Sequence, residues 1–239
     1  MRTDSPLLSI IIPTLNEAQV LAATLAHLHA TAETACEVLV CDGGSTDDTA
    51  ALASRHGARL LACPTRGRAA QLNFGAAQAR GELLYFLHAD TLPPPGFGRL
   101  IRHYHELGYR SGCFRLRFDV RHWVLRFSGW ASRFNAPFFQ FGDQSLFTEK
   151  VLFEQVGGFN EGLLLMEDVE LPARLKKAGR FVVMPHSVVT SARKYVSHGV
   201  LRTETTHLVV QALYVLGARQ QLIARVYHRL LGGRRRLRP

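Results

Sequence analysis

The first part of the chain alternates between short apolar segments and segments with helical spacing, and this alternation constrains the fold most. Continuous apolar runs are typical of strands that are buried on both faces of a parallel sheet. Strands that alternate with helices of about 10–15 residues favour a doubly wound, mostly parallel α/β sheet with helices on both faces. The expected strands are Leu7–Ile12, Glu37–Cys41, Arg59–Cys63 and Glu82–Leu87.

Polar segments follow three of these strands. Pro13–Glu17 comes after the first strand, Asp42–Gly44 after the second, and His88–Asp90 after the fourth. In open α/β sheets, ligands bind outside the carboxyl ends of the strands. We therefore expect the three segments to line one crevice.

Carboxylates and arginines near these strand ends suggest phosphate and metal chemistry. Asp90 could hold Mg²⁺ or Mn²⁺ together with phosphate oxygens and waters. Asp42 and Asp90 are each also explained as turn residues, but two aspartates at one edge of a sheet favour a site. Arg66 and Arg68 precede a predicted helix, where they suit either a diphosphate or a solvated surface.

Two nucleotide-binding classes lack their motifs in this chain. No Gly-x-Gly-x-x-Gly follows the first strand, and no Gly-Lys-Ser/Thr of a P-loop occurs. The sequence therefore gives no support to a nicotinamide-dependent dehydrogenase or a P-loop nucleotidase.

Length and composition favour a single domain. The chain has 239 residues, of which 47% are apolar, and we expect one domain over 1–239. It would consist of a nucleotide-binding half (about 7–110), an acceptor half (about 111–200) and a C-terminal helix with a basic tail (about 203–239). The 4 cysteines show no C-x-x-C spacing, which argues against a zinc site or a disulfide framework. With no signal peptide and no apolar run of roughly 20 residues, we expect a cytoplasmic protein.

The segment Phe114–Phe141 is rich in aromatic residues. Arginines are interleaved with them: Arg115, Arg117, Arg121, Arg126 and Arg133. These residues could pack in the core with the arginines reaching outward, or they could form an acceptor groove or a surface that dips into a membrane interface. Beyond this segment, two strands are expected near Phe181–Met184 and Val188–Ser191.

Positive charge gathers at the C-terminal end of a chain whose net charge is +10. No acidic residue follows Glu204, whereas arginines do: Arg219, Arg225, Arg229, Arg234, Arg235, Arg236 and Arg238. We expect one long helix from about Thr203 to Leu231, packed on its own domain or on the second subunit of a homodimer. Its basic end is either solvated or in peripheral contact with the inner face of a membrane, while the carboxylates argue against a nucleic-acid partner.

The pair Glu167-Asp168 stands where a helix is expected to begin. Acidic residues are favoured there by the helix dipole, which explains the pair without any function. A carboxylate at the mouth of a helix can also act as a general base if it faces a pocket. Local spacing does not decide between the two interpretations.

Taken in order, these motifs resemble family 2 glycosyltransferases of the GT-A fold. The resemblance covers about residues 7–195. It rests on the segments Ile10–Glu17, Asp42–Thr49, Arg66–Asn73, Leu87–Thr91, Gly157–Phe159 and Met166–Leu171. The His-Ala-Asp segment and Gly142–Gln144 resemble a compact bacterial subgroup, for which a role in cell-envelope or polysaccharide biosynthesis is expected.

The resemblance implies roles for individual residues. It assigns the nucleotide sugar to Pro13, Thr14, Asn16, Glu17, Asp42, Arg68, Ala89 and Asp90. It implies that Asp168 is the general base of an inverting reaction, with Glu167 beside it. Asp143 and Gln144 match the start of the acceptor-side loop, and Asp90 matches the aspartate that binds Mg²⁺ or Mn²⁺.

Two residues depart from the family pattern. His88 replaces the first aspartate of the Asp-x-Asp motif, so metal binding would depend on Asp90, with His88 or His198 as further candidate ligands. Gly43 replaces the second aspartate of the Asp-Asp-Gly-Ser pattern, which leaves Asp42 alone for ribose and base contacts. Ser191–Tyr195 keeps an arginine with an aromatic residue two places on, a weak form of the motif of processive synthases.

The implied function is transfer of one sugar from a nucleotide diphosphate sugar to an acceptor hydroxyl. The acceptor could be a glycan, a lipid-linked molecule or a small molecule. One alternative is a catalytically degenerate module that only binds sugar nucleotides. Another is a sugar-1-phosphate nucleotidyltransferase, although Pro13–Glu17 stands where that class carries a glycine-rich loop with arginine.

Overall fold

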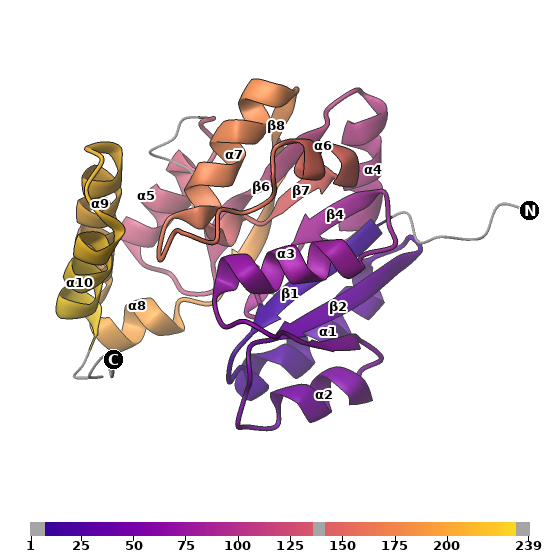
Figure 1. The fold of residues 1–239 in the computed structure, drawn as a ribbon, viewed down its shortest axis with the longest axis horizontal. Helices are drawn as coiled ribbons and strands as arrows, with labels where there is room; N and C mark the ends of the chain where they lie inside the picture. The colour runs from indigo at the N-terminus through magenta and orange to yellow at the C-terminus, as the bar shows by residue number, and fades with distance from the viewer. Residues whose placement is uncertain (1–7, 136–141, 233–239) are drawn as a thin grey trace, which may run out of the picture.

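The computed structural model describes residues 8–135 and 142–232. Within them, an 8-stranded sheet has the order β3-β2-β1-β4-β7-β6-β8-β5, with helices on both of its faces (Figure 1). The parallel strands β1 (Leu8–Thr14), β2 (Cys36–Asp42), β3 (Arg59–Ala62) and β4 (Leu83–Phe86) are those predicted from the apolar runs. The doubly wound, mostly parallel α/β arrangement is therefore confirmed.

The second half of the sheet is mixed. β7 (Leu146–Glu149) runs antiparallel to both β4 and β6 (Ser111–Phe118). β8 (Phe181–Thr190) runs parallel to β6, and β5 (Thr91–Leu92) pairs antiparallel with β8. The helix-and-strand alternation that marks the first half does not extend to this part.

The prediction of two strands near Phe181–Met184 and Val188–Ser191 is wrong, because β8 is one strand. Its pairing with β6 shifts register between Cys113 and Arg115. Proline has no N–H for the ladder and is tolerated at such a bulge, so Pro185 does not end the strand.

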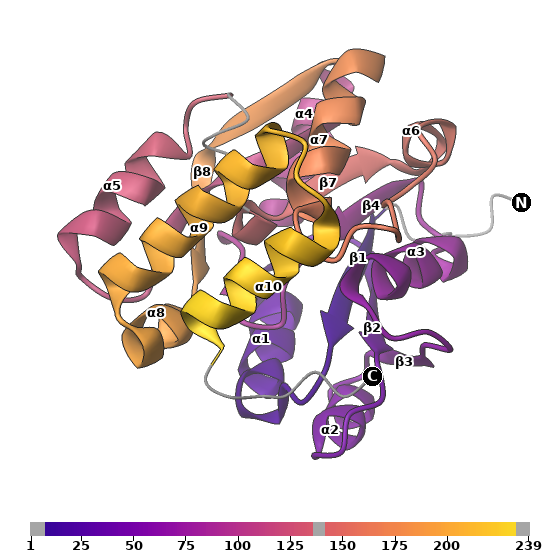
Figure 2. The ribbon, with the colours of Figure 1, turned by 60° about the vertical axis from the view of Figure 1, so that its left-hand side comes forward.

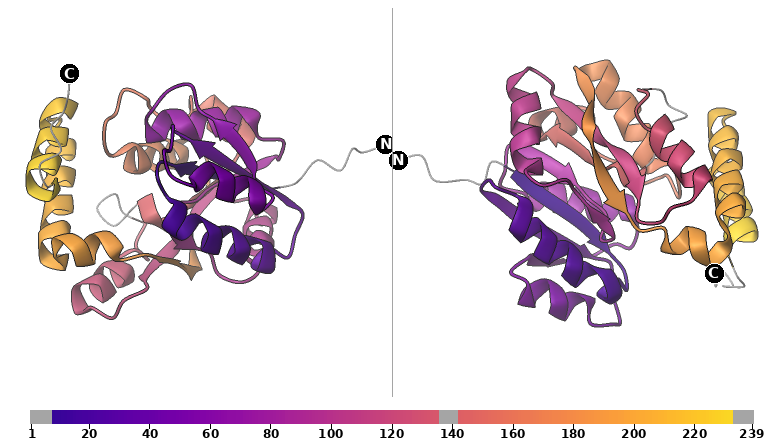
Figure 3. Two further views of the ribbon diagram at one scale, coloured as in Figure 1. Left: turned by 90° about the horizontal axis from the view of Figure 1, so that it is seen from below. Right: turned by 180° about the vertical axis from the view of Figure 1, so that it is seen from behind.

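Alternate residues of the strands supply two cores, one on either side of the sheet. Figure 3 shows the helices that cover these two faces. One core lies beneath α1 (Ala18–Thr31) and α4 (Phe97–Glu106). The other lies beneath α3 (Arg68–Gln78), α6 (Lys150–Gln155) and α7 (Glu167–Ala178). The short helix α2 (Thr49–Arg55) connects β2 to β3. This packing fixes where α3 and α7 begin, which is where the candidate site lies.

The expected single long C-terminal helix is two helices. α9 (Val200–Val215) and α10 (Gln220–Leu231) pack against one another as a hairpin at one edge of the molecule (Figure 1). Gly217, with φ of 74°, donates its N–H to the Tyr214 carbonyl, and Ala218 donates to the Leu213 carbonyl. This is the glycine-ended helix cap of a Schellman motif, so the apolar periodicity continues through a turn of the chain.

Two further helices lie next to this hairpin. α5 (Trp123–Ala131) follows β6, and α8 (Arg193–His198) leads from β8 into α9. Figure 2 shows α5, α9 and α10 side by side on the face turned toward the viewer. None of the described helices is both long enough and apolar enough to span a bilayer.

Candidate functional site

The loops after β1 and β2 are joined around Asp42. Its carboxylate accepts hydrogen bonds from the Thr14 hydroxyl (3.1 Å), the backbone N–H groups of Gly44 (3.0 Å) and Ser45 (2.8 Å), and the Ser45 hydroxyl (2.5 Å). Asp42 is buried. The carboxylate therefore fixes the shape of this loop before any ligand binds.

Asn16 ties the same two loops together from the other side. Its backbone N–H donates to the Ser45 hydroxyl (2.9 Å), and its side-chain oxygen accepts from the Thr46 N–H (2.8 Å). Asn16 has φ of 57°, a left-handed conformation that asparagine tolerates better than most residues. The structure thus brings Thr14, Asn16 and Asp42 together, as the sequence predicts.

Gln71, on α3, explains the glycine at position 43. Its side-chain nitrogen donates to the carbonyls of Thr14 (2.8 Å) and Cys41 (2.7 Å), so it ties α3 to the ends of β1 and β2. A Cβ added at Gly43 would lie 3.0 Å from that nitrogen. Gln71 was overlooked as a functional position in the sequence, although it lies inside the Arg66–Asn73 motif.

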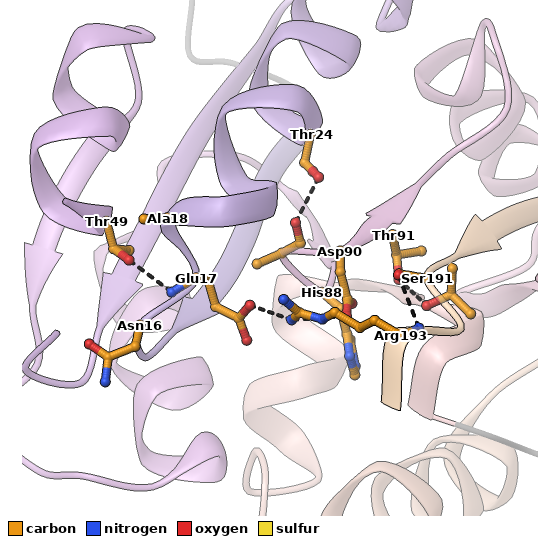
Figure 4. A network of polar contacts seen from close by, with 12 residues as sticks. Asn16, Glu17, Ala18, Thr24, Thr49, His88, Asp90, Thr91, Ser191 and Arg193 are labelled. Carbon is orange, nitrogen blue, oxygen red and sulfur yellow. Dashed lines mark hydrogen bonds and ion pairs between the residues drawn. The ribbon is translucent and has the colours of Figure 1, made fainter. Parts of the chain in front are cut away.

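Asp90 is paired with an arginine that follows β8. Its Oδ2 lies 3.2 Å from Nη2 of Arg193, the first residue of α8, and the same nitrogen contacts Glu17 (Figure 4). Next to Asp90, the Ala89 carbonyl accepts from the Thr24 hydroxyl at 2.7 Å. Arg193 was not assigned a role from the sequence, and its only signal there was the arginine of Ser191–Tyr195.

His88 faces Arg68 and Asp143. The Arg68 Nη2 lies 3.0 Å from Nδ1 of His88, and an Asp143 oxygen lies 3.2 Å from the same atom. Burial, followed by the charges of Arg68 and Lys194, holds the pKa of His88 well below its usual value. His88 is therefore neutral near pH 7, and its Nδ1 accepts from Arg68 rather than forming an ion pair with Asp143.

Arg68 connects this group to the acidic pair of α7. Its Nε lies 3.7 Å from Oε1 of Glu167, and its Nη1 lies 3.8 Å from Oδ2 of Asp168. Met166 (φ 73°) precedes the helix, so both acids stand in its first turn. Burial, and then the neighbouring Asp168 charge, raise the pKa of Glu167 to about 7, whereas Arg68 lowers it.

The two carboxylates of this pair differ in access. The side chain of Glu167 is 9% exposed and that of Asp168 is 27% exposed. Both line a cavity of about 380 Å³, which also receives Asp90 and Asp143. Burial raises the pKa of Asp143, against the opposing charges of Arg68 and Lys194.

The opposite wall of this cavity comes from α8, α9 and α10. It includes Lys194, His198, His207 and Tyr227, and the rings of His207 and Tyr227 stack with centroids 6.4 Å apart. Sequence reasoning placed His198 near the site but overlooked His207 and Tyr227, because their helix periodicity is equally typical of core packing.

Two other predicted residues have structural partners. The side-chain nitrogen of Gln144 donates to the carbonyls of Phe114 (3.1 Å) and Ser132 (2.9 Å), which anchors the turn η2 (Gly142–Gln144). Gln144 and Pro13 both line a smaller cavity of about 40 Å³ next to Arg68 and His88. The part of the aromatic segment at 136–141 lies outside the described residues.

The residues present fit a divalent cation that is shared with a substrate. Asp90 offers one carboxylate, and Mg²⁺ is commonly held by one or two carboxylates plus substrate phosphates and waters. The His88 Nδ1 already has Arg68 as its partner. Among residues 8–135 and 142–232, no group of three histidine, cysteine, aspartate or glutamate side chains could hold the ion alone.

Sequence comparisons identify related proteins. The model of glycosyl transferase family 2 matches residues 9–159. The uncharacterized glycosyltransferase Mb0553 of Mycobacterium bovis is 35% identical over 82 residues, which cover 34% of this chain and 36% of that relative. The chain thus matches about a third of the length of that curated protein. The uncharacterized protein MT1568 of Mycobacterium tuberculosis is 26% identical over 245 residues, covering 91% of this chain and 75% of that protein.

Solved structures resemble the whole described fold. The mannosyltransferase PcManGT from Pyrobaculum calidifontis, in complex with GDP-Man and Mn²⁺, has a TM-score of 0.69 and 19% identity, covering 95% of this chain and 70% of that chain. S. aureus TarS 1-349 in complex with UDP-GlcNAc has a TM-score of 0.65 and 16% identity, covering 94% and 71%. At these identities the likeness shows the fold, which is that of GT-A glycosyltransferases.

Proposed function

The chain belongs to glycosyl transferase family 2, and on that premise we propose that it transfers one sugar from a nucleotide diphosphate sugar to an acceptor hydroxyl. One observation carries the proposal. Asp90, which follows the carboxyl end of β4, and Asp168, at the start of α7, face the same cavity of about 380 Å³. A donor held at the strand ends and an acceptor on the α7 side could therefore meet there.

The donor side would be formed by the strand-end loops. Thr14, Asn16 and Asp42 form a rigid hydrogen-bonded rim suited to the nucleoside. Arg68 lines the cavity, and Arg193 contacts Asp90, which also lines it, so two guanidinium groups stand near the position where a diphosphate would lie. The GDP-Man and UDP-GlcNAc held by structures of the same fold support this class of donor.

Asp168 would act as the general base. Its side chain is three times as exposed as that of Glu167 and lines the cavity, so an acceptor hydroxyl can reach it. The acceptor oxygen would form its bond to the anomeric carbon as the bond to the diphosphate breaks, and Asp168 would take the hydroxyl proton. Because the attack comes from the side opposite the leaving group, the anomeric configuration inverts.

Charge on the departing diphosphate requires compensation. Arg68 and Arg193 would supply fixed positive charge at the site where it develops. A Mg²⁺ or Mn²⁺ ion, held by Asp90 together with the diphosphate, would add further positive charge. Glu167, buried and with its pKa raised to about 7, would position Arg68 against Asp168.

A binding module without transferase activity is the second candidate. It is favoured by one observation, the occupation of the Asp90 carboxylate by Arg193. Such a module would bind a nucleotide diphosphate and its sugar without consuming the donor.

A screen of nucleotide sugars by thermal shift, with and without Mn²⁺, would identify the donor. Product analysis by NMR would then give the anomeric configuration. Asp168→Asn should lower turnover by about 10²–10⁴-fold while leaving donor affinity near that of the wild type, because the amide cannot take the proton. Glu154→Gln, an exposed acid on α6, is the matched control and should be unaffected. Wild-type turnover in Asp168→Asn would remove Asp168 from this role, and donor binding without any turnover would favour the binding module.

A further inference from the structure

The outer face of α5 is aromatic. Trp123, Phe127 and Trp130 follow one another at helical spacing and are 73%, 61% and 47% exposed. The opposite side of the helix buries Leu125 and Ser128. Single exposed apolar residues are ordinary, but a row of large aromatic side chains on one helix marks an interaction surface.

α9 extends this surface. The Ser128 hydroxyl on α5 donates to Glu204 on α9 at 2.9 Å, so the two helices are neighbours (Figure 2). On the outside of α9, Leu201, Leu208 and Val215 are 61%, 59% and 58% exposed. No charged residue occurs between Glu204 and Arg219.

The exposed charges on these helices have one sign. Among the described residues, the exposed charged side chains of α5, α9 and α10 are arginines: Arg126, Arg202, Arg225 and Arg229. Glu204, the one acid of the three helices, turns inward to Ser128, and burial raises its pKa. Exposed tryptophan, phenylalanine and leucine beside arginine match the interface of a bilayer that contains anionic lipids.

A second copy of the chain fits this face less well. Two such faces would bring arginines against arginines, and like charges across an interface oppose association. An anionic lipid surface offers an apolar layer for the exposed aromatic and aliphatic side chains. It also offers negative charge for the arginines.

We propose that the outer faces of α5, α9 and α10 dock on the surface of an anionic lipid bilayer. The inner sides of α9 and α10, through His207 and Tyr227, line the cavity that contains Asp168. Docking would therefore bring the cavity within about one helix diameter, roughly 10–12 Å, of the lipid head groups. The inference rests on the proposed function only in assigning this cavity to the acceptor. The acceptor would then be a molecule at the membrane surface that carries the reacting hydroxyl.

Vesicle flotation with the full chain tests the proposal. The probes are vesicles of phosphatidylcholine alone and of equal parts phosphatidylcholine and phosphatidylglycerol, each at 0.1 M and 0.5 M NaCl. We expect binding to the anionic vesicles at low salt. The triple variant Trp123→Ala, Phe127→Ala, Trp130→Ala should reduce that binding by at least about tenfold, because interfacial binding scales with buried apolar area.

Two controls separate docking from folding and from the proposed reaction. The variant Leu107→Ala, Val151→Ala removes exposed apolar residues on α6 and at the end of α4, and it should bind vesicles like the wild type. The triple variant should keep its thermal melting point and its affinity for UDP or GDP. A second variant, Phe127→Glu, places one charge in the aromatic row and should weaken vesicle binding without removing three side chains.

Three results would overturn the proposal. The first is an absence of wild-type binding to anionic vesicles at 0.1 M NaCl. The second is undiminished binding by the triple variant, which would assign the binding to the basic C-terminal residues alone. The third is a wild type that does not bind vesicles and sediments as a dimer, while the triple variant sediments as a monomer. If the wild type showed no affinity for UDP or GDP, that result would instead count against the proposed function.

Discussion

The Asp90 carboxylate lies 3.2 Å from the guanidinium of Arg193, although 102 residues separate the two in the sequence. The contact is possible because β5, directly after Asp90, pairs with the end of β8, from which α8 begins. The Ser191 N–H donates to the Asp90 carbonyl at 3.1 Å and closes the same junction. The positively charged guanidinium of Arg193 thus lies next to the residue that the family resemblance implies is a metal ligand.

Arg193→Ala should lower kcat/KM for the donor by about 10²-fold, the effect typical of removing one preorganised donor from developing charge. Steady-state kinetics with the identified nucleotide sugar would measure it. Arg99→Ala, which breaks an exposed ion pair with Glu33, is the matched control and should leave kinetics unchanged. Unchanged kinetics in Arg193→Ala would show that the arginine serves only to neutralise Asp90.

Divalent metal should bind this protein only together with a nucleotide diphosphate. Asp90 is the one carboxylate assigned to the ion, it already has Arg193 as its partner, and phosphate oxygens would have to complete the ligand shell. Calorimetry with MnCl₂ should therefore show no binding to the free protein and clear binding in the presence of UDP or GDP. Asp90→Asn should abolish the second signal. Tight Mn²⁺ binding to the free protein would contradict this assignment.

Much of the N-terminal half, about residues 7–110, could be predicted from the sequence. Apolar runs and strand-end polar residues carry local signals, and Thr14, Asn16 and Asp42 meet as those signals imply. The contributions of Arg193, His207 and Tyr227 could not be predicted in this way. Arg193 meets Asp90 through the pairing of β5 with β8, a long-range feature that no local pattern encodes. The glycine that ends α9 is a local signal, but the packing that brings His207 and Tyr227 to the cavity is long-range.

Glu167 should make stability depend on pH. Its pKa is raised to about 7 in the folded protein by burial and by the Asp168 charge, while the ordinary value is 4.5. The folded state therefore binds this proton more tightly than the unfolded state, and the free energy of unfolding falls as pH rises from about 4.5 to 7. Glu167→Gln cannot ionise, so it should be more stable than the wild type at pH 8 by on the order of 2–3 kcal/mol relative to the difference at pH 4.5.

Urea unfolding of both proteins at pH 4.5, 6 and 8 would measure this dependence. Glu154→Gln, on the exposed side of α6, provides the control and should show the pH dependence of the wild type. If the Glu167→Gln difference is the same at all three pH values, the raised pKa of Glu167 is wrong.

Gly43 and Gln71 should prove to be energetically coupled. A side chain at position 43 would lie against the Gln71 amide, which donates to the Thr14 and Cys41 carbonyls. The added methyl would push that amide away by a few tenths of an ångström and weaken these two buried hydrogen bonds, each of which contributes about 0.5–1.5 kcal/mol to the free energy of unfolding. Gly43→Ala should therefore lower the free energy of unfolding, and Gln71→Ala should lower it as well. In the double variant the two losses should not add, because Gln71→Ala removes the group that the methyl introduced by Gly43→Ala would displace. A double-mutant cycle by urea unfolding measures the coupling, and fully additive losses would mean that Gln71 is not the reason for glycine at position 43.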